Sequence, residues 1–148
     1  MKEIMNILLV EDNDLDVEIL HRARKKMGMP GTMVRAQDGL EALDILQSDD
    51  LRRALPSPFV VLLDINMPRM NGHEFLEELR KTELIADARV FVFTTSDNPV
   101  DVSKAYAQHA SGYIKKPSNS KDLTSILDAL YAFWAKCENP SPEYRNHG

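Results

Sequence analysis

The chain has 148 residues, of which 43% are hydrophobic and 28% charged, and these values are typical of one globular domain with a hydrophobic core. Its net charge of −5 argues against nonspecific binding to nucleic acid, and no apolar run approaches the roughly 20 residues of a membrane-spanning helix. The single cysteine, Cys137, excludes an internal disulfide, and the N-terminus lacks a signal peptide, so we expect a cytoplasmic protein.

The first part of the chain alternates apolar runs with helical patterns. The apolar run Ile4–Val10 ends in the acidic stretch Glu11–Asp14, and apolar positions then recur at helical spacing up to Gly28. Glycine commonly ends helices, so we expect the first helix to stop there. Thr32–Ala36 is a weak strand candidate. A second helix is predicted over Asp38–Leu46, whose first residues resemble a capping box.

The central part of the chain contains its most informative stretch. Phe59–Leu63 is apolar without interruption, which predicts a strand buried on both faces of a parallel sheet. Asp64 follows this strand directly, and turn-forming residues come next. A helical pattern then covers Gly72–Leu84. The charged, proline-containing stretch Asp49–Pro58 precedes the strand and indicates a surface loop with room for one helical turn.

The last part of the chain continues the alternation. Val90–Phe93 is another apolar strand, followed by a helix that begins at Pro99. Gly112–Lys115 is a short strand, and the last helix covers about Ser120–Cys137. Residues 138–148 are polar, so we expect a disordered tail there and assign residues 1–137 to one domain. Five alternations of strand and helix predict a doubly wound α/β fold, with one parallel sheet covered by helices on both faces.

Polar side chains follow four of the predicted strands at one edge of the sheet, because parallel strands share their carboxyl edge. These residues are Glu11, Asp12, Asp64, Thr94 and Lys116. Three carboxylates brought together repel one another unless a cation lies between them, and an all-oxygen cluster suits Mg²⁺ better than zinc. A carboxylate nucleophile, a hard cation, a hydroxyl and a lysine together favour phosphoryl transfer to Asp64. Taken alone, Asp64 would more simply start a turn.

These residues, together with the sequence DINMPRMNG from Asp64, make the chain resemble the receiver domain of bacterial response regulators over roughly residues 6–136. The resemblance implies a flavodoxin-like fold with a five-stranded parallel sheet in the order 2-1-3-4-5. It implies that Asp64 is the phosphoacceptor. It also implies that Mg²⁺ is held by Glu11, Asp12, Asp64 and the backbone carbonyl of Asn66.

The resemblance further implies a switch in the second half of the domain. Thr94 and Lys116 would contact the phosphoryl group, and Tyr113 would change position once Thr94 moves toward the phosphate. A cis peptide bond is implied at Lys116–Pro117. The chain departs from the usual pattern at Glu11, where aspartate is more common, and at Thr95, where a smaller residue is usual.

The resemblance and the chain's extent also predict partners. No output domain follows the last helix, so we expect a stand-alone response regulator that accepts its phosphoryl group from a histidine kinase. Ala129, Tyr131 and Phe133 lie off the core-facing stripe of the last helix, which predicts a homodimer, although scattered exposed aromatics are a plainer explanation. The stretches EDNDLD and FTTSDN are similar to those of single-domain regulators partnered with phytochrome-type histidine kinases.

Two other classes of protein remain as alternatives. A magnesium-dependent phosphatase or phosphotransferase of the haloacid-dehalogenase type also uses an aspartyl nucleophile at a strand end. Such enzymes need a second aspartate two residues later as a general acid, and here that position is Asn66. A binding module that has lost phosphorylation is disfavoured by Asp64, the acidic pair and Lys116. We therefore do not expect an enzyme, beyond catalysis of the protein's own phosphorylation and dephosphorylation.

Overall fold

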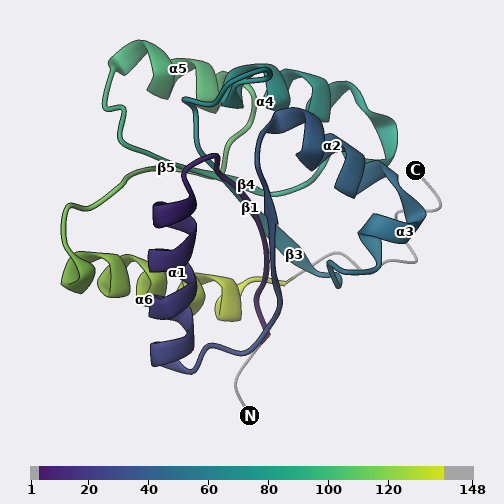
Figure 1. Ribbon diagram of the computed structural model, residues 1–148. Coiled ribbons are helices and arrows are strands. Elements are labelled where there is room, and N and C mark those ends of the chain that lie inside the picture. The colour runs from purple at the N-terminus through teal and green to yellow at the C-terminus, as the bar shows by residue number, and fades with distance from the viewer. Residues whose placement is uncertain (1–3, 139–148) are drawn as a thin grey trace.

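The computed structural model describes residues 4–138 and contains one sheet of five parallel strands (Figure 1). The strands are β1 (Asn6–Val10), β2 (Met33–Ala36), β3 (Phe59–Leu63), β4 (Val90–Thr94) and β5 (Gly112–Lys115). They lie side by side in the order β2-β1-β3-β4-β5. The predicted strand order and the flavodoxin-like α/β fold are therefore confirmed.

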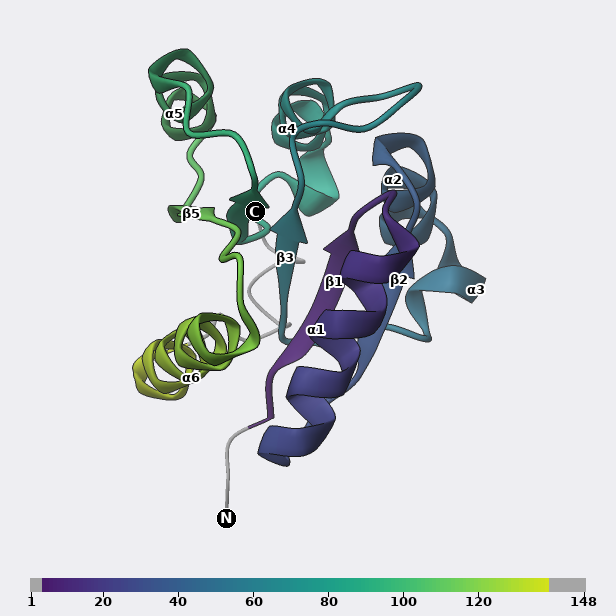
Figure 2. The ribbon, with the colours of Figure 1, turned by 60° about the vertical axis from the view of Figure 1, so that its left-hand side comes forward.

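Helices connect the strands as the alternation predicts. They are α1 (Asp14–Met27), α2 (Gly39–Gln47), the single turn α3 (Asp49–Arg52), α4 (Gly72–Lys81), the 3₁₀ turn η1 (Glu83–Ile85), α5 (Pro99–Ala107) and α6 (Ser120–Lys136). In Figure 2, α1 and α6 lie on one face of the sheet, and α2, α4 and α5 lie on the other. None of these helices is long and apolar enough to cross a membrane.

The central strands contribute side chains to both faces of the sheet. All five residues of β1 and all five of β3 are buried. Leu8 and Val61 pack into the core beneath α2 and α4, whereas Leu9 and Leu62 pack into the core beneath α1 and α6. This alternation follows from the two-residue period of a strand. It explains why β3 shows no polar position, as the sequence predicted.

Helix ends follow the local sequence closely. Asn13 caps α1 by accepting the amide of Asp16, and Gly28 ends that helix in the left-handed region at φ 66°. Asp38 caps α2 by accepting the amide of Glu41 at 3.0 Å. The full reciprocal capping box forms instead at the start of α4, between Asn71 and Glu74.

Two details differ from the predictions. Helix α4 stops at Lys81 rather than Leu84, because Thr82 takes an extended conformation and its hydroxyl bonds back to the carbonyl of Glu78 at 2.8 Å. The predicted cis bond at Lys116–Pro117 is wrong, and the cis bond among the described residues is Ser57–Pro58. The Lys116–Pro117 bond is trans, the isomer that most X–Pro bonds take.

The last helix is tied to the first strand at the amino edge of the sheet. Trp134 is buried, and its indole N–H donates to the carbonyl of Ile4 at 3.1 Å. The guanidinium of Arg89 lies 5.7 Å from the centroid of the Trp134 ring. The expected disordered tail, residues 138–148, lies outside the described residues except for Glu138.

Candidate functional site

The three predicted carboxylates meet at the carboxyl edge of the sheet. Val10 pairs with Leu63 in the register of β1 and β3, so Glu11 and Asp64 leave neighbouring strands at the same level. Glu11 and Asp64 are buried and Asp12 is exposed. A carboxylate oxygen from each of the three lies within 4.8 Å of the other two. This arrangement brings three negative charges to one point and suits a divalent cation.

The ammonium of Lys116 lies against this cluster. Its Nζ is 2.7 Å from Glu11 Oε2 and 3.6 Å from Asp64 Oδ2. It is also 3.0 Å from Asp16 Oδ2, in the first turn of α1. Burial alone would lower the pKa of Lys116, but the bonds to Glu11 and Asp16 and the charge of Asp64 outweigh burial and raise that pKa. Lys116 is therefore a fixed positive charge beside Asp64.

Glu11 has an unusual protonation equilibrium. Its burial is the largest influence and raises the pKa of Glu11 to about 7, with a smaller contribution from the charge of Asp64. The hydrogen bond from Lys116 acts in the opposite direction. A bound cation would favour the ionised carboxylate, so cation binding and proton release at Glu11 are linked.

The loop that carries Glu11 and Asp12 is held by Arg35 of β2. Its guanidinium donates to the carbonyl of Glu11 at 2.8 Å and to the carbonyl of Asp12 at 3.2 Å. The same group pairs with Asp14 at 2.7 Å. The backbone of both acidic residues is thereby fixed to the neighbouring strand, and their side chains are free to face the cluster.

The loop from β3 to α4 is shaped by close packing at Gly72. Its amide donates to the carbonyl of Ile65 at 2.9 Å, and a Cβ atom at this position would lie 2.5 Å from the carbonyl oxygen of Asp64. Only glycine allows this approach without a shift. The loop lines an open cleft of about 650 Å³ into which Asp12 and Asn66 also face. Asn66 is exposed and lines this cleft together with Asp12 of the acidic cluster.

The two predicted switch residues, Thr94 and Tyr113, are joined through one residue, Ser96. Thr94 is fully buried, and its hydroxyl oxygen accepts the amide of Ser96 at 3.4 Å. The hydroxyl of Tyr113 donates to the carbonyl of Ser96 at 2.8 Å. The Ser96 hydroxyl in turn donates to Asp101 of α5 at 2.6 Å, and Asp101 lies 2.9 Å from His73 of α4. The loop after β4 is thus connected to both switch side chains and to two helices.

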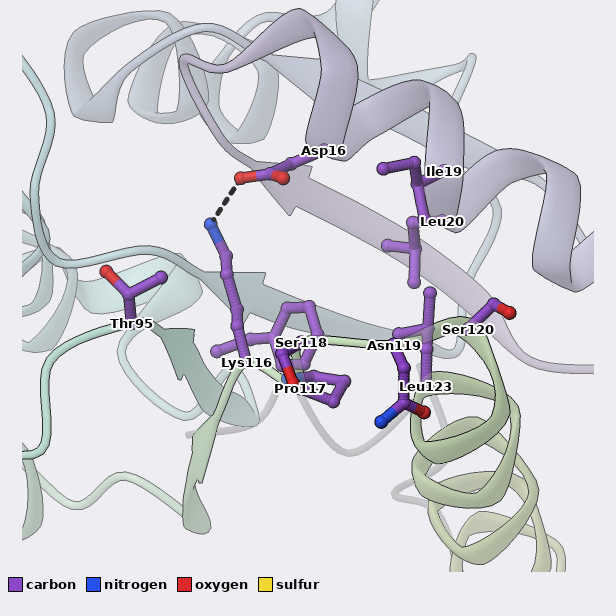
Figure 3. Close-up of a pocket in the computed structure, with 11 residues that line it drawn as sticks. Asp16, Ile19, Leu20, Thr95, Lys116, Pro117, Ser118, Asn119, Ser120 and Leu123 are labelled. Atoms are coloured by element: carbon purple, nitrogen blue, oxygen red, sulfur yellow. Dashed lines mark hydrogen bonds and ion pairs between the residues drawn. The ribbon is translucent and has the colours of Figure 1, made fainter.

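A second hollow, a groove of about 290 Å³, lies on the α1 side of Lys116. Its lining includes Leu20 of α1, Phe93 of β4 and Leu123 of α6. Figure 3 shows Asp16 and Lys116 pointing toward each other from opposite sides of this groove. Thr95 is exposed and lines the same groove.

Comparison with known proteins gives this site its family. The profile of the response regulator receiver domain matches residues 7–128. The chain belongs to this family. Receiver domains are the phosphoryl-accepting modules of two-component systems, and their partners are histidine kinases. The comparisons give no support to the alternative of a small-molecule phosphatase.

Individual relatives of this receiver domain cover most of its length. It is 35% identical over 129 residues to the probable methanogenesis regulatory protein FilR2 of Methanothrix harundinacea. This match covers 86% of this chain and 82% of FilR2. It is 34% identical over 128 residues to the response regulator Rcp1 of Synechocystis sp. This match covers 86% of this chain and 87% of Rcp1.

Solved structures give the same result. The Mn²⁺-bound form of Rcp1 matches with a TM-score of 0.78 at 31% identity, covering 94% of this chain and 100% of that one. The phosphorylated cyanobacterial phytochrome response regulator RcpA matches with a TM-score of 0.81 at 32% identity, covering 94% and 99%. The receiver fold predicted from the resemblance is therefore confirmed.

Sequence reasoning found the strand-end residues of this receiver domain but missed their supporting contacts. Asp16 and Ser96 lie within the stretches EDNDLD and FTTSDN, but the sequence did not indicate their contacts with Lys116 and Tyr113, and Arg35 belongs to no motif. A signal existed for Arg35, which is a charged residue inside a short predicted strand one position before the buried Ala36. For Asp16 the only signal was its place in EDNDLD, which did not distinguish it from Asp14 in the same stretch.

Proposed function

We propose that the protein is a response regulator whose Asp64 accepts a phosphoryl group from a histidine kinase. One observation carries this proposal: the Asp64 carboxylate is buried beside two further carboxylates and 3.6 Å from the Lys116 ammonium. A nucleophile, a cation site and a fixed positive charge therefore share one edge of the sheet. We propose that this chemistry belongs to a single receiver domain formed by residues 1–137.

The donor set at this edge fits Mg²⁺. The Asp12 and Asp64 carboxylates and the buried Glu11 offer hard oxygen ligands, and the exposed position of Asp12 leaves room for water. We assign these three residues and the backbone carbonyl of Asn66 as the protein ligands. Bound Mg²⁺ would neutralise part of the negative charge of the site and of the incoming phosphoryl group.

The transfer itself is a displacement at phosphorus. An oxygen of Asp64 forms a bond to phosphorus while the bond from phosphorus to the imidazole nitrogen of the kinase phosphohistidine breaks, and the electron pair stays on that nitrogen. Lys116 would contact one phosphoryl oxygen and the hydroxyl of Thr94 another. Once transfer is complete, the resulting acyl phosphate holds the added charge at the carboxyl edge of the sheet.

Movement of Thr94 toward the phosphoryl group would carry the signal outward. Its present hydrogen bond is with Ser96, whose carbonyl holds the Tyr113 hydroxyl. A shift of Thr94 would therefore change the loop after β4, release Tyr113 and alter the surface formed by α5, β5 and α6. This coupling predicts that Thr94→Ala still accepts phosphate on Asp64 but loses phosphorylation-dependent partner binding.

We infer that the kinase is of the phytochrome type, and that the protein acts in the cytoplasm. Support for the kinase comes from the relatives, because RcpA is a phytochrome response regulator and Rcp1 matches along nearly the whole chain. Phosphotransfer profiling against a panel of histidine kinases tests this inference. Preferential transfer from kinases of another class would overturn it.

We propose that the protein forms a homodimer through α6. Ala129 and Phe133 are exposed there, with 58% of Phe133 accessible, and Phe133 packs edge-on to Phe91 with ring centroids 6.5 Å apart. Tyr131 contributes less than the sequence indicated, because it is partly buried against the core beneath α1 and α6.

Size-exclusion chromatography with light scattering tests the dimer. The wild type should elute at about twice the monomer mass of 16.8 kDa, and Phe133→Asp should be monomeric. Leu84→Asp is the matched control, because Leu84 is 79% exposed on η1, outside α6. A wild type that stays monomeric at high concentration would exclude the dimer.

Incubation with acetyl phosphate and Mg²⁺, followed by intact-mass measurement, tests the proposed function. The wild type should gain one labile phosphoryl mass, and Asp64→Asn should gain none. Asp128→Asn is the control, because this exposed carboxylate lies on α6 and outside the acidic cluster. An unmodified wild type, or equal labelling of Asp64→Asn, would disprove the assignment of Asp64.

A further inference from the structure

Lys116 has three carboxylate partners, and only two of them belong to the acidic cluster. Its Nζ lies 2.7 Å from Glu11, 3.0 Å from Asp16 and 3.6 Å from Asp64. The longest of these distances is the one to Asp64, the proposed phosphoacceptor. In this structure the ammonium is thus held mainly by Glu11 and Asp16.

Asp16 differs from the other two partners in its relation to the cation site. Glu11 and Asp64 lie in the cluster that suits a divalent cation, whereas Asp16 lies outside it. Asp16 is fixed in the first turn of α1, where its amide donates to the capping side chain of Asn13 at 3.0 Å. Its side chain is 39% exposed, and that of Lys116 is 10% exposed. When a cation engages Glu11 and Asp64, Asp16 keeps its full charge for Lys116.

We propose that Asp16 is a positioning residue that holds Lys116 toward α1 and competes with the phosphoryl group for its ammonium. This inference rests on the proposed function and deepens it, because it concerns the regulation of the same site. As the phosphoryl group is transferred to Asp64, Lys116 must exchange its bond with Asp16 for a bond with a phosphoryl oxygen. The ion pair between Asp16 and Lys116 stabilises the ground state and is lost in the transition state. It therefore raises the activation barrier, and Asp16 slows phosphorylation of Asp64.

Acetyl phosphate is a suitable probe, because no kinase surface contributes to its reaction. An oxygen of Asp64 bonds to phosphorus, the bond from phosphorus to the acetyl oxygen breaks, and acetate leaves with the electron pair. The rate of phosphoryl mass gain at saturating Mg²⁺ is measured for wild type and variants. Asp16→Asn should accelerate it by about two- to fivefold, the range expected when a partly exposed ion pair is removed.

Matched variants separate this role from a general charge effect. Glu18→Gln removes the same charge from α1 at a residue that pairs with Arg22, and it should leave the rate unchanged. Asp16→Glu keeps the charge and should stay nearer to the wild type than Asp16→Asn. In a Lys116→Gln background, Asp16→Asn should have no further effect, because its influence passes through Lys116.

The possible outcomes are distinct. Acceleration by Asp16→Asn alone, lost in the Lys116→Gln background, supports the proposal. An unchanged or slower rate for Asp16→Asn, an equal change for Glu18→Gln, or persistence of the effect without Lys116 would overturn it while leaving the proposed function intact. A wild type that gains no phosphoryl mass would overturn both.

Discussion

At the scale of single residues, Asp38 shows how one buried carboxylate fixes the surroundings of the site. It caps α2 through the amide of Glu41 and accepts a hydrogen bond from Arg69 Nε at 2.7 Å. Arg69 lies in the loop between β3 and α4 and has a positive φ of 64°, which is uncommon for a residue with a side chain. The ion pair therefore ties the loop that follows Asp64 to the start of α2.

The pKa of Asp38 gives a prediction with a definite sign. Burial, the largest influence, would raise it, but the bonds from Glu41 and Arg69 outweigh burial and lower the pKa of Asp38 below its ordinary value of 3.8. A carboxylate with a depressed folded-state pKa stabilises the fold above its ordinary pKa, and this stabilisation is lost as the pH falls through the folded-state value. Asp38→Asn keeps a helix cap but loses the charge.

Urea denaturation of Asp38→Asn and wild type at several pH values measures this contribution. At pH 7 the variant should be less stable by about 1.5–3 kcal/mol, the range for hydrogen bonds to charged groups. The difference should stay constant down to about pH 5 and shrink below 3.8, the ordinary value for this carboxyl. A difference that persists unchanged at pH 3 would show that the charge of Asp38 is not its source.

At the scale of secondary-structure elements, Arg80 joins α4 to the segment that precedes β4 and to the segment that follows α5. Its guanidinium donates to the carbonyls of Ala86 and Ala88, which precede β4, at 2.9 and 2.6 Å. It also donates to the carbonyls of Gln108 and His109, which follow α5, at 2.8 and 3.0 Å. One side chain thus satisfies four carbonyls in two connections that have no regular backbone pairing.

We predict that Arg80→Met lowers the free energy of unfolding by about 2–4 kcal/mol, because it leaves several partly buried carbonyls without a donor. Lys81→Met is the matched control. The Lys81 side chain is 63% exposed and pairs with Glu77 within the same helix, so its loss should change stability by less than about 0.5 kcal/mol. Chemical denaturation measures both. Similar losses for the two variants would mean that the Arg80 bonds contribute no special stability.

At the scale of the whole molecule, a cation held by the acidic cluster would couple its binding to the stability of the fold. A ligand that binds the folded state alone stabilises it by about 2.7 kcal/mol at a hundredfold excess over its Kd. Mg²⁺ should therefore raise the Tm relative to EDTA. Asp12→Asn should lose most of this increase and Asp128→Asn should retain it. An equal increase in Tm for both variants would place cation binding elsewhere on the molecule.

The architecture was predictable because it depends on repeated local patterns. The uninterrupted apolar run of β3, the glycine at the end of α1 and the polar residues at strand ends each have one dominant structural explanation. The end of α4 was not predictable, because the hydroxyl of Thr82 turns inward to Glu78 although the helical pattern continues. The cis bond was predicted at the wrong proline, since isomer choice depends on how the surrounding chain packs.

The acidic set and Lys116 followed from topology alone, because parallel strands deliver their last residues to one edge. The contacts that position this set did not follow. Arg35 is 24 residues from Glu11 and Lys116 is 100 residues from Asp16, and no periodic pattern records such pairs. The sequence thus predicts which groups meet at the site. Which carboxylate lies nearest to the Lys116 ammonium can be read only from the folded structure.

Trp134 gives this protein a built-in optical reporter. It is the single tryptophan of the chain, and its contact with Ile4 places it at the amino edge of the sheet, opposite the acidic cluster. Its fluorescence emission should shift when the protein unfolds and change little when Asp64 is modified, because Trp134 lies near the end of α6, away from the carboxyl edge where the proposed rearrangement of α5, β5 and α6 begins. Emission that changed on modification would mean that the signal crosses the entire sheet to the beginning of β1.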